Sequence, residues 1–126
     1  FVVFGQSLGG AVSLRAVPDF QGRDKVTLIV QDSTFSSYED IASDRMRQAW
    51  PLWPLSPLAY PLISDKYASE AVFDKIIWPT LVITGGKDNV MPPKFGKRIY
   101  KGIATKKKWL WHVENAPHIS SFHVDQ

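Results

Sequence analysis

The residue most able to do chemistry is a serine at the centre of a glycine-rich turn. The stretch GQSLG, residues 5–9, fits the pattern Gly-x-Ser-x-Gly and follows the apolar run Phe1–Phe4. Where such a turn joins a buried strand to a helix, it is typical of a nucleophile elbow, with the serine hydroxyl pointing out above a sheet. Glycines are expected on both sides because strand and helix pass too close for a Cβ, and the next amide is expected to point toward the same spot as the hydroxyl. The predicted elbow therefore consists of Gly5, Gln6, Ser7, Leu8 and Gly9.

A serine hydroxyl is a weak nucleophile without a base, and the base needs an acid to orient it. Asp32 ends the second predicted strand and Asp88 follows the apolar part of the third. Sites form at the carboxyl ends of parallel strands, so both are candidate acids. His118 lies in a loop after the last predicted strand and is the favoured base. His112 falls inside that strand, where a packed or hydrogen-bonded role is expected, and His123 is expected on a terminal helix.

The elements that would position these residues alternate between strands and helices. Four apolar runs predict buried strands: Phe1–Phe4, Lys25–Ser33, Thr80–Asp88 and Lys106–Val113. Helices are predicted between them at residues 7–17 and 92–103. This alternation predicts an α/β fold with a parallel sheet and helices packed on its faces.

A long excursion separates the second predicted strand from the third. Residues 36–76 are predicted to hold a helix at 36–50, a segment rich in proline and tryptophan, and a short helix at 64–76. An excursion of this length above a parallel sheet is typical of a cap over a site. The side chains expected to face a substrate are Trp50, Trp53, Leu55 and Leu58, although packing of the cap against the body explains them equally well.

Several stretches together resemble the α/β-hydrolase superfamily. FVVFGQSLGG, TLVITGGKDNVMPP and ENAPH are similar to its nucleophile, acid and histidine motifs and occur in the order Ser, Asp, His. QDSTFSSYEDIA and PLISDKYASEAVFDKIIWPTLVITGGKD resemble a serine-hydrolase branch that includes lipid and acyl-protein esterases. The resemblance runs over essentially all 126 residues and corresponds to the C-terminal half of that fold, so residues 1–126 are expected to form a single partial domain.

The resemblance implies a structure and a mechanism. It implies a three-layer, mainly parallel sheet of about four strands flanked by helices, with residues 36–76 as a helical cap. It assigns Ser7 as the nucleophile, Asp88 as the acid and His118 as the base, with the Leu8 amide as one oxyanion donor. The implied activity is hydrolysis of an ester, thioester or amide through an acyl-enzyme, without cofactor or metal. Pro117 departs from the pattern, because a glycine usually precedes the histidine.

The resemblance also suggests that this chain is a fragment. Chains of the family normally contain about as much sequence again before the elbow, including the loop that donates the second oxyanion N–H. We therefore expect the isolated chain to lack full activity. We also expect the edge formed by Phe1–Phe4 to pair with upstream strands or with a second copy of the chain.

Composition narrows the function classes further. The absence of cysteine excludes disulfides, thiolate metal sites and a cysteine nucleophile, and three histidines make a multi-histidine metal site a poor expectation. Residues 80–126 carry eight Lys and Arg against three acidic residues, which suits an anionic surface or a solvated helix face. No aromatic or glycine pattern for nucleic-acid contact accompanies them. The expected partner is a small acyl substrate, lipid-like acyl groups included, with a membrane surface as a candidate docking site and a cytoplasmic or membrane-peripheral location.

Two other interpretations compete with an enzyme. The first is a non-catalytic binding or interaction module on the same fold, which the three intact residues Ser7, Asp88 and His118 argue against. The second is a nucleotide-binding domain with GQSLGG as a phosphate loop. That loop lacks both the Lys-Ser/Thr pair of a P-loop and the spacing of a dinucleotide fingerprint.

Overall fold

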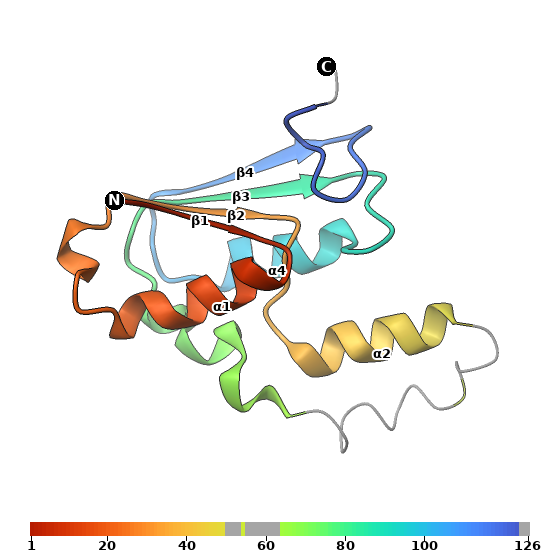
Figure 1. The fold of residues 1–126 in the computed structure, drawn as a ribbon, viewed down its shortest axis with the longest axis horizontal. Coiled ribbons are helices and arrows are strands. Elements are labelled where there is room, and N and C mark those ends of the chain that lie inside the picture. The colour runs from red at the N-terminus through yellow and green to blue at the C-terminus, as the bar shows by residue number, and fades with distance from the viewer. Residues whose placement is uncertain (50–53, 55–63, 124–126) are drawn as a thin grey trace.

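A parallel sheet forms the centre of the computed structural model, which describes residues 1–49, 54 and 64–123 (Figure 1). The sheet has four strands, hydrogen-bonded in the order β1-β2-β3-β4 and all parallel. The strands are β1 (Val2–Gln6), β2 (Leu28–Asp32), β3 (Thr80–Gly85) and β4 (Lys108–Val113). Because all four strands are parallel, their carboxyl ends lie at one edge of the sheet.

Helices connect the strands. The α-helices are α1 (Leu8–Ala16), α2 (Tyr38–Gln48) and α4 (Pro93–Gly102). Short 3₁₀ helices are η1 (Val17–Asp19), η2 (Arg23–Lys25), η4 (Asp65–Tyr67) and η5 (Ser69–Lys75). The start of α2 is capped twice, because the Ser37 hydroxyl accepts from the Asp40 N–H at 3.0 Å and the Asp65 carboxylate accepts from the Tyr38 N–H at 2.6 Å. These caps satisfy amides that have no partner within the helix.

The predicted strands and the helices between them are confirmed in kind, with shifted ends. The second strand begins at Leu28 rather than Lys25, because residues 23–25 turn as η2. The third strand ends at Gly85, where a turn begins. The short helix predicted at 64–76 is present as two 3₁₀ helices, η4 and η5. The terminal helix expected to carry His123 is wrong for the described residues, since 117–123 form turns and bends.

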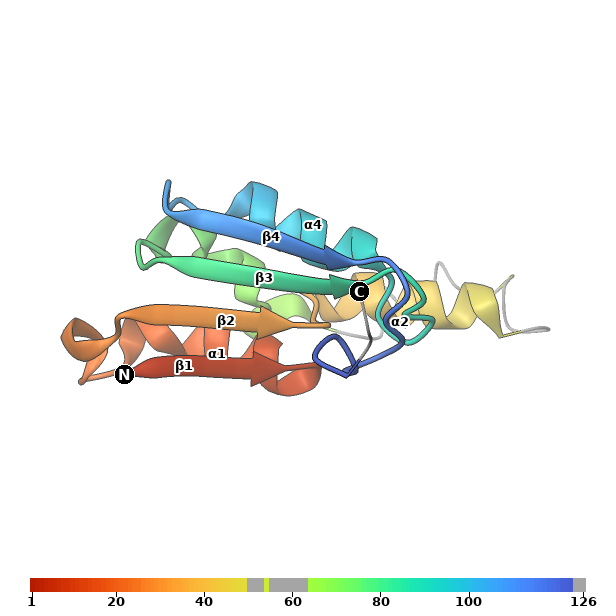
Figure 2. The same cartoon turned by 90° about the horizontal axis from the view of Figure 1, so that it is seen from above.

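The two faces of the sheet differ in the described residues. The described helices α1 and α4 both pack on one face, where Leu14 and Ile99 meet Ile29 and Val82 in a single buried core (Figures 1 and 2). No described helix covers the opposite face. The predicted four-stranded parallel sheet with flanking helices is confirmed, and in the described residues these helices lie on one face.

The uncovered face of the sheet is apolar. By the strand register, Val2, Phe4 and Trp109 point to this face, and each is more than half exposed. In the described residues β1 pairs only with β2, so its outer side is an unpaired edge. The predicted partner for this edge, an upstream segment or a second copy, stays a prediction.

The proposed cap is described only in part. Helix α2 extends beyond the carboxyl ends of the strands (Figure 2). The predicted substrate-facing residues Trp50, Trp53, Leu55 and Leu58 lie outside the described residues, so the assignment of 36–76 as a cap stays a prediction. Within the residues that are described, no helix has the length and apolar character needed to cross a bilayer.

Candidate active site

Ser7 occupies a sharp turn between β1 and α1. Its backbone has φ 52° and ψ −127°, a conformation that side-chain-bearing residues rarely adopt. The turn is fixed from both sides by the next strand, because the Ser7 N–H donates to the Asp32 carbonyl at 2.9 Å and the Thr34 hydroxyl donates to the Ser7 carbonyl at 2.5 Å. Such strain persists only where neighbouring structure imposes it, and it is concentrated at functional sites.

The glycines of the elbow do not share one role. A Cβ on Gly5 would lie 2.3 Å from the Ser13 hydroxyl and 2.6 Å from the Gly10 Cα, so the expected close approach of strand and helix holds there. A Cβ on Gly9 would meet nothing within 4 Å, so that expectation is wrong for Gly9. The crowded position is Gly10, where a Cβ would lie 2.6 Å from Thr34. The sequence indicated a close approach here through the pair Gly9-Gly10, and it is the second glycine of the pair that packs against Thr34.

Asp88 lies in the turn that follows β3, and its side chain is fully buried. One carboxylate oxygen, Oδ1, accepts from the Val90 and Met91 N–H groups at 2.9 and 2.6 Å. The other, Oδ2, lies 2.8 Å from Nδ1 of His118. A carboxylate held by two backbone amides has a fixed orientation, so it presents one oxygen to the imidazole.

His118 lies between Asp88 and Ser7. Its Nε2 atom is 3.2 Å from the Ser7 Oγ, and its side chain retains 20% exposure. A carboxylate offers no donor, which places the ring proton on Nδ1 and leaves Nε2 to accept from the serine hydroxyl. Three side chains that are 30 and 111 residues apart thus form one hydrogen-bonded chain.

The loop that carries His118 is packed against the turn after β3. A Cβ on Gly85 would lie 2.4 Å from the Ala116 carbonyl oxygen, and a Cβ on Gly86 would lie 2.2 Å from the Glu114 oxygen. The Lys87 N–H donates to Ala116 at 3.1 Å. The Gly-Gly turn therefore lets the acid loop and the histidine loop approach closely, despite the proline that precedes the histidine.

The other candidates from the sequence lie elsewhere. Asp32 is also fully buried, but it accepts from Gln6 at 2.9 Å and from the Ser33 hydroxyl at 3.1 Å. Within the described part of the chain, no hydrogen bond links it to an imidazole. His112, on β4, bonds to the Thr84 hydroxyl at 3.0 Å through Nδ1. His123 lies in the final described turn, with its N–H donating to the Ser120 carbonyl.

The surroundings of Ser7 suit a developing negative charge. Leu8 is the first residue of α1, so its N–H has no acceptor within the helix, and the positive end of the helix dipole lies at the same place. Leu8 itself is 56% exposed. The described residues contain no group of three or more metal-ligating side chains. The serine hydroxyl, the imidazole and the Leu8 N–H together allow proton transfer and nucleophilic attack beside a backbone donor.

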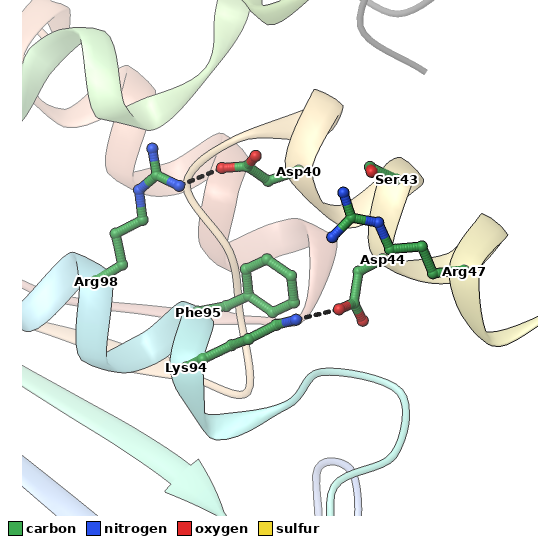
Figure 3. Close-up of a pocket in the computed structure, with 7 residues that line it drawn as sticks. All are labelled: Asp40, Ser43, Asp44, Arg47, Lys94, Phe95 and Arg98. Atoms are coloured by element: carbon green, nitrogen blue, oxygen red, sulfur yellow. Dashed lines mark hydrogen bonds and ion pairs between the residues drawn. The ribbon is translucent and has the colours of Figure 1, made fainter. Parts of the chain in front are cut away.

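A separate cleft of about 290 Å³ lies between α2 and α4 (Figure 3). Lys94 pairs with Asp44 and Arg98 pairs with Asp40 across it, and Arg98 also bonds to Glu70 at 2.9 Å. Burial acts to lower the pKa of Arg98, but the hydrogen bonds and charges of Glu70 and Asp40 outweigh it and raise that pKa above its usual value. None of Ser7, Asp88 or His118 lines this cleft. The ion pairs across it form an ionic contact between α2 and α4 that is separate from the serine site.

Known proteins resemble this chain over part of their length. It is 30% identical over 122 residues to the uncharacterized protein YfhR of Escherichia coli O157:H7, covering 96% of this chain and 39% of YfhR. It is 29% identical over 129 residues to the α/β hydrolase domain-containing protein WAV2 of Arabidopsis thaliana, covering 98% of this chain and 40% of WAV2. The chain thus spans about two fifths of the length of these curated relatives. The sequence matches no protein-family model.

Solved structures share the fold. The esterase PF2001 of Pyrococcus furiosus superimposes with a TM-score of 0.70 and 20% identity, covering 97% of this chain and 47% of the esterase. At that identity the likeness concerns the fold. The sheet and its helices form part of the α/β-hydrolase fold, which is the fold that the resemblance implied.

Proposed function

We propose that the protein is a serine hydrolase that cleaves an ester, thioester or amide through an acyl-enzyme on Ser7. The observation that supports this most directly is the hydrogen-bonded chain from Ser7 through His118 to Asp88, at 3.2 and 2.8 Å. Because this chain spans about two fifths of its curated relatives, the activity of the whole protein is part of the proposal.

The first half of the reaction forms the acyl-enzyme. Ser7 Oγ attacks the carbonyl carbon of the substrate while Nε2 of His118 takes the hydroxyl proton. Asp88 holds the ring with Nδ1–H toward its own carboxylate and stabilises the imidazolium that forms. The carbonyl oxygen becomes an oxyanion and accepts from the Leu8 N–H, a type of contact whose removal typically costs about 2.7–4 kcal/mol of transition-state stabilisation. The intermediate collapses, and the leaving group departs with the proton from Nε2.

The second half regenerates the serine. A water molecule attacks the acyl carbon and gives one proton to Nε2 of His118. The second tetrahedral intermediate then collapses, the Ser7 oxygen recovers that proton, and the carboxylic acid leaves. Water replaces the proton that departed with the leaving group, so the protons balance over the cycle without a cofactor. The apolar acyl group predicted from Trp50 and Trp53 rests on residues outside the described part and stays a prediction.

The test is covalent labelling of the intact protein with a fluorophosphonate probe, followed by peptide mapping of the modified residue. We expect the label on Ser7 and its complete loss in Ser7→Ala. The matched control is Ser69→Ala, which removes a buried hydroxyl that has no hydrogen-bond partner among the described residues. A folded wild-type protein that neither reacts with the probe nor turns over p-nitrophenyl esters would favour the binding-module interpretation.

A further inference from the structure

Asp32 is a buried carboxylate for which the proposed chemistry has no use. It ends β2 with no exposed surface, and no described Lys, Arg or His forms an ion pair with it. Burying a carboxylate without a counter-charge is costly unless hydrogen bonds hold it. Its position therefore calls for a reason beyond packing.

The partners of Asp32 belong to three segments around Ser7. Its Oδ2 accepts from the side-chain amide of Gln6, the residue immediately before the serine, at 2.9 Å. Its Oδ1 accepts from the hydroxyls of Ser33 at 3.1 Å and Ser121 at 3.5 Å. One carboxylate thus bonds to the elbow, to its own strand end and to the segment that follows His118.

The segment from His118 to Ser121 is a compact turn. Ile119 has φ 53°, the Ser120 N–H donates to the Pro117 carbonyl, and the Ser120 hydroxyl donates to the His118 carbonyl at 3.2 Å. Ser121 is almost fully buried at the end of this turn. Because the turn is internally bonded, fixing Ser121 also fixes the backbone of His118.

The turn is held on both sides. Before His118, the Lys87 N–H bonds to Ala116. After it, Phe122 packs edge-on to Trp111 with ring centroids 5.5 Å apart and lies 6.4 Å from Phe4. The segment after β4 crosses back over the ends of β1 and β2, in dark blue in Figure 2. Asp32 supplies the polar contact on this downstream side.

We propose that Asp32 is a positioning residue that fixes the distance between Ser7 and His118. It does so by holding the elbow through Gln6 and the histidine turn through Ser121. This inference rests on the proposed function, since it concerns the same serine and histidine. The Nε2–Oγ separation of 3.2 Å is at the upper end of the hydrogen-bond distances that proton transfer needs. A displacement of about 1 Å can cost about 100-fold in rate.

The test is a double-mutant cycle in the intact protein, with p-nitrophenyl acetate as the substrate. We expect Asp32→Ala to lower kcat about 100-fold and Ser121→Ala about 10-fold, each with little change in KM. The double variant should be no slower than Asp32→Ala, because both changes break the same connection. Asp32→Asn should recover much of the rate, since it keeps one acceptor oxygen and can donate to a serine hydroxyl.

A second readout does not depend on activity. Hydrogen exchange of the amides of residues 118–123 should accelerate in Asp32→Ala and Ser121→Ala and stay unchanged in the control Ser69→Ala. If Asp32→Ala does not fold, Ser121→Ala alone decides. A Ser121→Ala protein with the kcat and the exchange of the Ser69→Ala control overturns the inference. If the proposed serine-hydrolase function is itself wrong, the result is different: turnover survives in Ser7→Ala.

Discussion

The hydrogen-bonded chain Ser7–His118–Asp88 and the ionic contact between α2 and α4 both join residues far apart in the sequence, but they are built differently. In the first, the carboxylate is fully buried and the imidazole is 20% exposed. In the second, the Lys94 and Arg98 side chains are 61% and 48% exposed. Water therefore competes more strongly for the cations of the ionic contact than for the carboxylate and imidazole of the site.

The backbone differs in the same way. The three described residues other than glycine with positive φ are Ser7, Ser33 and Ile119, and each is at or next to the site or Asp32. The ionic side chains instead project from the regular helices α2 and α4 (Figure 3). The serine site combines strained backbone with buried groups, so the positions of its atoms are tightly fixed. The ionic contact joins exposed side chains on regular helices, so it depends mainly on opposite charges lying near each other. Substitutions should therefore have large effects in one region and small effects in the other.

The largest effect is expected at Asp88. In Asp88→Asn the amide oxygen can still accept from Val90 and Met91, so the NH₂ group faces the imidazole. The ring must then carry its proton on Nε2, where it cannot take a proton from Ser7. We expect kcat for p-nitrophenyl acetate to fall roughly 10⁴-fold with the fold retained.

The control for this substitution is Asp74→Asn, which makes the same chemical change at an exposed position on η5. Circular dichroism of both variants should match the parent protein. An Asp88→Asn enzyme that kept more than a tenth of the parental kcat would show that the bond from His118 to Asp88 is not needed for the reaction.

An intermediate effect is expected at the glycines of the elbow. Gly10→Ala places a Cβ 2.6 Å from Thr34, whose hydroxyl holds the Ser7 carbonyl, so we expect a loss of about 1–3 kcal/mol in the free energy of unfolding. Gly9→Ala meets open space on a helix and should be neutral or stabilising by up to about 1 kcal/mol. Urea unfolding of the two variants measures the contrast. Equal losses at both glycines would contradict this account of the turn.

Much of this site could be predicted from the sequence, because its groups are placed by local signals. The Gly-x-Ser-x-Gly turn after an apolar run predicted the position of Ser7 at the carboxyl end of β1. Asp88 and His118 each follow a predicted strand, and parallel strands bring such positions to one edge. The choice between Asp32 and Asp88 needed the resemblance, since both residues lie at the ends of predicted strands and spacing alone does not separate them.

The rest of the arrangement depends on tertiary contacts that leave no local pattern. The bond from Thr34 to Ser7 and the bond from Ser121 to Asp32 join hydroxyls to distant groups, and single serines and threonines carry no signal of such partners. The terminal helix predicted around His123 was wrong because Ser121 and Phe122 are held by Asp32 and by aromatic rings, in a turn with positive φ at Ile119. The placement of the described helices α1 and α4 on the same face of the sheet also could not be predicted. An apolar run indicates that both faces of a strand are apolar, but it does not indicate which helix packs on which face.

The smallest effect is expected at Arg98. Arg98→Met keeps the aliphatic stem and removes the ion pairs with Asp40 and Glu70. Exposed pairs contribute little, since solvent screens the charges and the long side chains lose entropy, so we expect a loss below about 1 kcal/mol in the free energy of unfolding. The loss should shrink further in 1 M salt, where the Debye length is about 3 Å. Urea unfolding at low and high salt measures it, with Lys97→Met as the control for a cation on the same helix with no ion pair to a described residue. A salt-insensitive loss above about 2 kcal/mol would mean that this contact, like the serine site, depends on fixed geometry, and the contrast between the two regions would fail.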